Sequence, residues 1–135
     1  MNKLFRILLI DDDFSTNYLH KKIISKIISD TPIESVDSGK DGLEKLLDLN
    51  EKNKDKNVSI LIFLDLNMPV MDGWGFLKKF DEIQNKLNFT VNLYVLSSSI
   101  NPDDEVKVKK HKFVNGYYSK ILSSETILKI KETYC

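Results

Sequence analysis

The chain has 135 residues, of which 41% are hydrophobic, and its 20 Lys and Arg balance its 20 Asp and Glu. This length suits one domain with a single core, predicted over residues 1–135, and the balanced charge excludes a global attraction for nucleic acid or a membrane surface. The single Cys135 cannot staple the fold, and no leader or membrane-length apolar stretch is present, so we expect a cytoplasmic protein.

Apolar runs recur along the chain, and each ends in polar residues. Continuous runs of this kind are typical of parallel strands that are buried on both faces. In chain order the runs and the residues that follow them are 6–10 with Asp11-Asp12-Asp13, 60–64 with Asp65, 92–96 with Ser97, and the short 116–119 with Lys120. A weaker run, Ile33–Val36, is expected at an edge of the sheet.

Helical spacing of apolar residues between these runs predicts five helices. Their marker residues are Leu19, Ile23, Ile24, Ile27 and Ile28; Leu43, Leu46 and Leu47; Phe76, Phe80, Ile83 and Leu87; the opening signal Asn101-Pro102; and Ile127, Ile130 and Tyr134. The polar segment 49–57 is expected to be an extended helix end followed by a solvated loop. Alternation of strands and helices predicts an α/β fold with a doubly wound parallel sheet.

The strand ends carry the chemistry of this chain. Right-handed crossovers bring the carboxyl ends of parallel strands to one edge of the sheet, where open α/β sheets bind ligands. We therefore expect carboxylates, a hydroxyl and an ammonium group around Asp65, and the signals Met68-Pro69 and Asp72-Gly73 turn the chain immediately after it. Clustered carboxylates without His or Cys favour Mg²⁺, and a carboxylate nucleophile beside Mg²⁺ and a lysine can accept a phosphoryl group.

With these residues in this order, the chain from Arg6 to Tyr134 resembles the receiver domains of two-component response regulators, in form close to the stand-alone chemotaxis type. The resemblance implies a flavodoxin-like sheet of five strands in the order 2-1-3-4-5 with five helices. It also implies roles for individual residues: Asp65 as phosphoacceptor, Asp11 and Asp12 as the acidic pair that binds Mg²⁺ with Asp65 and the carbonyl of Asn67, Ser97 as the phosphate-binding hydroxyl, Tyr117 as the switching aromatic, and Lys120 as the family's lysine.

The resemblance further implies that a sensor histidine kinase or a histidine phosphotransfer protein supplies the phosphoryl group. No output domain follows Tyr134 in the sequence, so output is expected through contact with an unknown protein target, from a monomer or weak dimer. The expected chemistry is self-phosphorylation and self-dephosphorylation, so we do not predict an enzyme.

Two local questions stay open in the sequence. Three aspartates compete for two places, so Asp12-Asp13 is an alternative acidic pair, although the spacing from Asp12 to Leu19 and Ile23 favours Asp11-Asp12. The family commonly has Pro after the lysine, behind a cis peptide bond, whereas Ile121 follows Lys120 here. A cis bond before a non-proline residue costs roughly 3–4 kcal/mol, so we predict a trans Lys120-Ile121 bond.

Other functional readings are weaker. A phosphorylation-independent pseudo-receiver is the main alternative, although no residue of the expected site is missing. A haloacid-dehalogenase-type phosphatase would use Asp11-Asp12-Asp13 differently, but the chain lacks a late acidic pair and room for a substrate cap. His20 and His111 are expected to be ordinary histidines rather than phosphohistidines or metal ligands, and the lysines of 107–112 a solvated helix face.

Overall fold

The computed structural model describes residues 3–54, 57–68, 72–98 and 101–134, so residues 69–71 of the predicted turn and Cys135 lie outside the described residues. Five parallel strands form one sheet in the order β2-β1-β3-β4-β5, which confirms the predicted topology. The elements are β1 Lys3–Ile10, α1 Phe14–Ile27, β2 Ile33–Val36, α2 Gly39–Lys52, β3 Val58–Asp65, α3 Gly73–Ile83, the 3₁₀ turn η1 Gln84–Lys86, β4 Thr90–Ser97, α4 Pro102–Lys109, β5 Val114–Ser119 and α5 Ser124–Tyr134.

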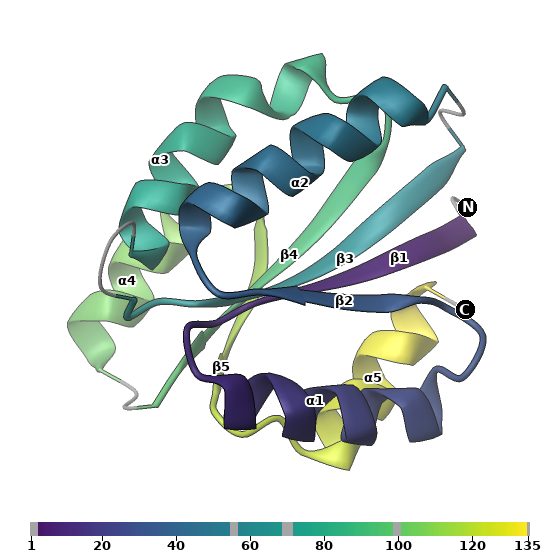
Figure 1. The fold of residues 1–135 in the computed structure, drawn as a ribbon. Helices are drawn as coiled ribbons and strands as arrows, with labels where there is room; N and C mark the ends of the chain where they lie inside the picture. The colour runs from purple at the N-terminus through teal and green to yellow at the C-terminus, as the bar shows by residue number, and fades with distance from the viewer. Residues whose placement is uncertain (1–2, 55–56, 69–71, 99–100, 135) are drawn as a thin grey trace.

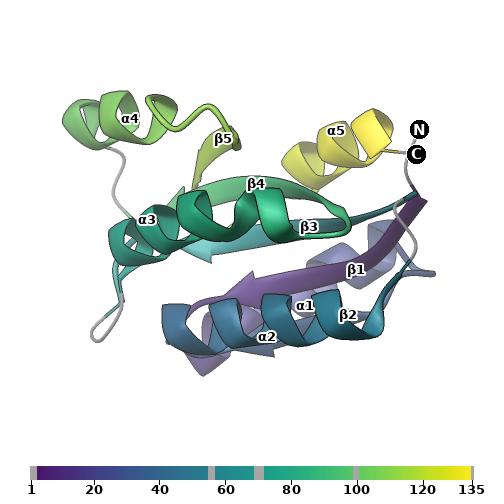
Figure 2. The ribbon, with the colours of Figure 1, turned by 90° about the horizontal axis from the view of Figure 1, so that it is seen from above.

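Helices cover both faces of the sheet. Figure 1 shows α2 and α3 above the strands and α1 and α5 below them, and Figure 2 shows α4 beside β5 at one edge. The strands β1 and β3 alternate between the two layers, because successive side chains of a strand point to opposite faces. Leu8 and Ile10 join the core under α2 and α3, whereas Ile7 and Leu9 join the core over α1 and α5.

The strand β3 lies at the centre of the sheet and carries Asp65 as its last residue. All eight of its residues are buried, and it pairs with β1 on one side and β4 on the other. Paired strands on both sides leave β3 little freedom to shift in register. Asp65 therefore sits at the end of a fully buried strand that is paired on both sides.

Polar side chains cap four of the helices at their first turn. Asp13, Ser38, Asp72 and Asn101 accept hydrogen bonds from backbone N–H groups of α1, α2, α3 and α4 respectively. Such caps satisfy N–H groups that have no partner inside the helix. The cap Asn101 with Pro102 behind it agrees with the predicted opening of the fourth helix.

The predicted elements are all present, with different ends. The strand predicted from Arg6 begins at Lys3, and the extended second helix continues to Lys52 as expected. The third helix ends at Ile83 and is followed by η1, so Leu87 lies beyond the helix that it was predicted to mark. The predicted edge position of Ile33–Val36 is confirmed. Within the described residues, no helix is long and apolar enough to cross a membrane.

Candidate functional site

The predicted strand-end residues converge at one edge of the sheet. Asp11 and Asp12 follow β1, Asp65 ends β3, Ser97 ends β4 and Lys120 follows β5. In the sheet register, Asp65 lies opposite Leu96 of β4, and Ser97 lies opposite Ser119 of β5. Four neighbouring strands therefore deliver carboxylates, a hydroxyl and an ammonium group to one place.

Asp65 is almost fully buried, with 2% of its surface exposed. One of its oxygens, Oδ1, accepts a hydrogen bond of 3.1 Å from the backbone N–H of Asn67, and the other, Oδ2, lies 3.3 Å from Nζ of Lys120. Burial, followed by repulsion from Asp11, raises the pKa of Asp65 to about 6. Around neutral pH this carboxylate is ionised, although burial and the charge of Asp11 make ionisation unfavourable. A cation beside it would offset that free-energy cost.

Lys120 bridges two carboxylates. Its Nζ donates a hydrogen bond of 2.9 Å to Oδ2 of Asp11 and lies 3.3 Å from Oδ2 of Asp65. Burial by itself lowers the pKa of Lys120, but the contacts with Asp11 and Asp65 outweigh burial and leave the pKa above its ordinary value. The lysine is therefore a permanent positive charge beside the carboxylate of Asp65.

Asp11, Asp12 and Asp65 form an oxygen-only cluster that suits a hard divalent cation. Each offers a carboxylate oxygen, and these oxygens lie within 4.8 Å of one another. Asp13 is engaged elsewhere, because its carboxylate caps α1 by accepting from the N–H of Ser15 and the hydroxyl of Thr16, both at 2.9 Å. The hydrogen bond with Thr16, and then that with Ser15, lowers the pKa of Asp13. This geometry favours Asp11-Asp12 over Asp12-Asp13 as the acidic pair.

The donor set fits Mg²⁺, which prefers carboxylate, carbonyl and water oxygens in a compact octahedral arrangement. Three carboxylates leave positions for waters and for phosphoryl oxygens. The carbonyl ligand predicted for Asn67 stays a prediction, since the contact that the structure shows for this residue is its N–H to Asp65.

Ser97 and Tyr117 lie on neighbouring strands behind the site. Ser97 is buried, with 1% of its surface exposed, and its carbonyl accepts a 2.8 Å hydrogen bond from the backbone N–H of Lys120. Tyr117 packs against the core under α2 and α3, and its hydroxyl is buried without a hydrogen-bond partner in the described part of the chain. The ring of Tyr117 thus points inward in this structure.

The predicted trans bond between Lys120 and Ile121 is wrong, because the structure has this bond in the cis form. The trans form is preferred in an isolated peptide, whereas in the folded chain tertiary hydrogen bonds hold the residues on either side of the Lys120-Ile121 bond. The N–H of Lys120 donates to Ser97, and the N–H of Leu122 donates 3.1 Å to Nε2 of His20. The reach of Lys120 to Asp11 and Asp65 is preserved.

Two residues of α1 take part in the site's framework and were missed from the sequence. Asn17 donates a buried 2.9 Å hydrogen bond to the backbone carbonyl of Asp11. His20 is buried, and its Nε2 accepts a hydrogen bond from the backbone N–H of Leu122. A usable signal was present, because these two polar residues stand three apart on the face of α1 that also carries buried Ile24.

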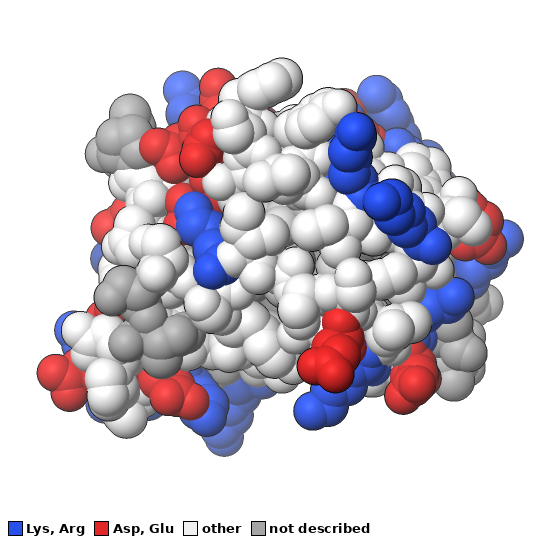
Figure 3. All heavy atoms as spheres, turned by 90° about the horizontal axis from the view of Figure 1, so that it is seen from below, with Lys and Arg blue, Asp and Glu red and all other residues white. Residues whose placement is uncertain are grey.

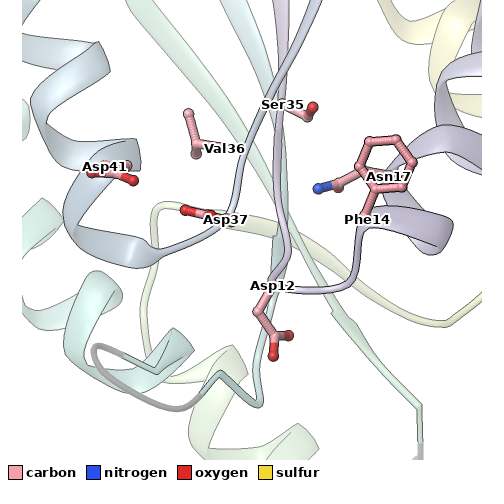
Figure 4. A pocket seen from close by; sticks show the side chains of 7 residues that line it. All are labelled: Asp12, Phe14, Asn17, Ser35, Val36, Asp37 and Asp41. Atoms are coloured by element: carbon pink, nitrogen blue, oxygen red, sulfur yellow. The ribbon is translucent and has the colours of Figure 1, made fainter.

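A hollow of about 440 Å³ lies beside the carboxylate cluster, between α1, β2 and α2. Its lining includes Asp12, Asp37, Asp41 and the exposed Phe14. Figure 4 shows the carboxylate of Asp12 directed away from Asp37 and Asp41. Asp12 therefore belongs to the cluster with Asp11 and Asp65, and it also lines the neighbouring hollow.

The profile of the response regulator receiver domain matches residues 7–132. The chain belongs to the response regulator receiver family. A solved two-component response regulator from Cytophaga hutchinsonii is similar to this receiver domain, with 29% identity, 98% coverage of each chain and a TM-score of 0.78. The Mn²⁺-bound form of the response regulator Rcp1 is 25% identical with a TM-score of 0.73, covering 96% of this chain and 94% of that one.

A curated relative is the hybrid signal transduction histidine kinase L of Dictyostelium discoideum, which is 30% identical over 105 residues, 77% of this receiver domain and 6% of the kinase. The chain spans 10% or less of the length of the curated relatives that it matches. The matched stretch is therefore a small part of a much longer kinase chain in each case.

Proposed function

We propose that this receiver domain accepts a phosphoryl group on Asp65 from a phosphohistidine of a histidine kinase or phosphotransfer protein. The observation that carries the proposal is the buried carboxylate of Asp65 with Lys120 Nζ 3.3 Å away and two further carboxylates beside it. A structural ion pair alone would not need a third carboxylate, that of Asp12, beside the two that contact Lys120. The kinase identity of a curated relative supports the class of donor.

The chemistry follows from the positions of these groups. A carboxylate oxygen of Asp65 attacks phosphorus and forms an acyl phosphate, while the bond from phosphorus to the histidine nitrogen breaks and the imidazole leaves with the electron pair. Lys120 offsets negative charge on the transferred oxygens. A Mg²⁺ ion held by Asp11, Asp12 and Asp65 would supply charge neutralisation and orientation of the phosphoryl group. The Mn²⁺-bound neighbour supports a divalent cation at this cluster.

The reaction consumes one donor phosphoryl group per receiver molecule, so the proposed role is a signalling acceptor rather than an enzyme that turns over substrate. Phosphorylation places new anionic oxygens within reach of Ser97 and Lys120. A ligand shifts a conformational equilibrium only through differential contacts, and these two residues can supply them. Tyr117 is the residue through which the change would reach the surface of α4, β5 and α5.

A protein partner needs access to the site edge, and the face of α1 and α5 offers a suitable surface. Figure 3 shows this face with a broad uncharged area at its centre and most charged side chains around it. Large apolar residues are exposed on these elements: Phe14, Tyr18 and Leu19 of α1, Ile121 of the loop after β5 and Leu128 of α5. Phe14 and Ile121 adjoin Asp13 and Lys120 in the chain, so this surface reaches the site. The downstream target, the oligomeric state and the cytoplasmic location stay predictions.

The decisive experiment is incubation with acetyl phosphate or phosphoramidate and Mg²⁺, followed by intact mass measurement. We expect the mass of one phosphoryl group on the parent protein and none on Asp65→Asn, because the amide is a far poorer nucleophile of nearly the same shape. Asp81→Asn, on the exposed side of α3, is the matched control and should load normally. Equal labelling of Asp65→Asn at the same site would refute Asp65 as the acceptor. No loading of the parent would refute the proposal as a whole and favour a pseudo-receiver.

A further inference from the structure

The position of Lys120 depends on a short loop after β5. On the sheet side, the backbone N–H of Lys120 donates 2.8 Å to the carbonyl of Ser97. On the other side, the next anchored residue is Leu122, which is buried, with 2% of its surface exposed. Ile121 between them is exposed at 47%. Whatever holds Leu122 therefore decides where the backbone of Lys120 can lie.

His20 supplies that hold. Its side chain is buried, with 1% of its surface exposed, and its Nε2 accepts a buried 3.1 Å hydrogen bond from the N–H of Leu122 across 102 residues of sequence. An accepting Nε2 places the proton of the neutral ring on Nδ1. Burial lowers the pKa of His20, which keeps the accepting form populated around neutral pH.

The same face of α1 also holds Asp11, the carboxylate that pairs with Lys120. Asn17, one helical turn before His20, donates 2.9 Å to the carbonyl of Asp11, and Asp11 accepts from Lys120 Nζ at 2.9 Å. Residues three apart on a helix are neighbours on its surface. Two neighbouring side chains of α1 thus form hydrogen bonds with both the loop that carries Asp11 and the loop that carries Lys120.

A simple packing role for His20 accounts for its burial but not for the choice of residue. An apolar side chain of similar size would fill the space and leave the N–H of Leu122 buried without an acceptor, which is costly. The hydrogen bond goes to the backbone two residues after Lys120. A change there moves the point from which the lysine side chain reaches Asp65.

We propose that His20 is a positioning residue for phosphoryl transfer, which fixes the loop after β5 so that Lys120 Nζ meets Asp11 and Asp65. This inference rests on the proposed function of Asp65 as acceptor. In this role His20 binds neither the phosphoryl group nor the metal. It acts through the backbone of Leu122.

The first test separates the hydrogen bond from packing by comparing His20→Leu with His20→Gln. Gln keeps an acceptor at nearly the same reach, whereas Leu has none. With acetyl phosphate at saturating Mg²⁺, we expect the loading rate of His20→Leu to fall about tenfold or more, because a misplacement of about 1 Å can cost up to about a hundredfold. His20→Gln should recover most of the rate, and His111→Leu, a histidine exchanged far from the site, should match the parent.

Metal affinity supplies the readout that a merely structural role would not produce. Calorimetric Mg²⁺ affinity should change less than about twofold in His20→Leu, since Asp11, Asp12 and Asp65 are all retained. Proton exchange at the Leu122 amide should accelerate in His20→Leu and stay slow in His20→Gln. The ¹⁵N shifts of the parent's His20 should show an unprotonated Nε2.

A double-mutant cycle with Lys120→Ala tests the path of the effect. If His20 acts through Lys120, His20→Leu should change the loading rate less than about twofold in the Lys120→Ala background, as coupled sites are non-additive. Equal losses in both backgrounds, equal defects in the Leu and Gln variants, or a parent rate in His20→Leu would overturn the inference. Failure of the parent to load at all would instead refute the function of Asp65, so the two failures are distinct.

Discussion

At the scale of single residues, Asp65 shows a conflict between burial and charge. Its carboxylate is ionised at neutral pH although burial and Asp11 raise its pKa from 3.8 to about 6. The neutral acid contributes stability that is fully present below pH 3.8 and is lost as the pH rises through about 6. The ionised form, which the proposed acceptor role requires, is therefore the destabilised one in the absence of a cation.

Asp65→Asn should consequently stabilise the metal-free protein at pH 7 and have less benefit at pH 4. The gain at pH 7 is on the order of 1–3 kcal/mol, because one pKa unit corresponds to about 1.4 kcal/mol and the lost contact with Lys120 offsets part of it. Chemical denaturation in a chelating buffer at both pH values measures this. Asp30→Asn, at an exposed position, should show no such difference, and a larger gain at pH 4 would contradict the argument.

Tyr117 also lowers the stability of the fold, because its hydroxyl is buried without a hydrogen-bond partner in the described structure. Tyr117→Phe should leave the free energy of unfolding unchanged or raise it by about 1 kcal/mol, since it removes an unsatisfied group and keeps the ring. Tyr118→Phe on the same strand is the control and should be close to neutral. A clear loss of stability in Tyr117→Phe would show that the hydroxyl has a partner in solution.

At the scale of elements, the turn between β3 and α3 depends on close backbone contact. The N–H of Gly73 donates 2.8 Å to the carbonyl of Leu66, and a Cβ at position 73 would lie 2.5 Å from the Cα of Leu66 and 2.8 Å from the carbonyl oxygen of Asp65. Backbone cannot give way as a flexible side chain can. The Asp-Gly signal in the sequence thus has a steric reason as well as a capping one.

Gly73→Ala should therefore push α3 away from the end of β3 and lower stability by about 2 kcal/mol or more, in the range found for overpacked sites. It should also weaken Mg²⁺ binding, because a shift of the Leu66 backbone would displace the neighbouring Asp65 and its carboxylate. Lys78→Ala, on the exposed side of α3, provides the comparison. Parent-like thermal unfolding and Mg²⁺ affinity in Gly73→Ala would show that the turn has more room than its geometry indicates.

At the scale of the whole molecule, the carboxylates of Asp11, Asp12 and Asp65 join the loop after β1 to the end of β3, and Lys120 adds the loop after β5. A ligand that binds only the folded state stabilises it by mass action. At a Mg²⁺ concentration about 100 times its dissociation constant, unfolding should become harder by about 2.7 kcal/mol. Asp12→Ala should lose most of this stabilisation, and its metal-free form should be at least as stable as the parent, since carboxylate repulsion is relieved.

Asp37→Asn is the matched control for the metal experiment, because Asp37 lines the neighbouring hollow and is not part of the cluster of Asp11, Asp12 and Asp65. It should keep the full Mg²⁺ stabilisation in thermal unfolding. If Asp37→Asn loses the effect and Asp12→Ala retains it, the cation binds in the hollow instead.

The sequence alone determined the strands, the parallel sheet and the convergence of Asp11, Asp12, Asp65, Ser97 and Lys120, because apolar runs ending in polar residues reflect burial along the chain. The resemblance supplied the strand order, which the structure confirms. Local patterns also show the helix caps, since a cap is made within one turn.

Only the tertiary structure decided the cis bond before Ile121, the engagement of Asp13 as a helix cap, and the bonds of Asn17 and His20. Each of these depends on partners that meet in space or on competition between local options. His20 bonds a residue 102 positions away, and no periodicity in the sequence reports such a pairing. The Lys120-Ile121 bond was misjudged for the same reason: its local preference is visible in the sequence, whereas the contacts that hold its neighbours, through Ser97 and His20, exist only in the folded chain.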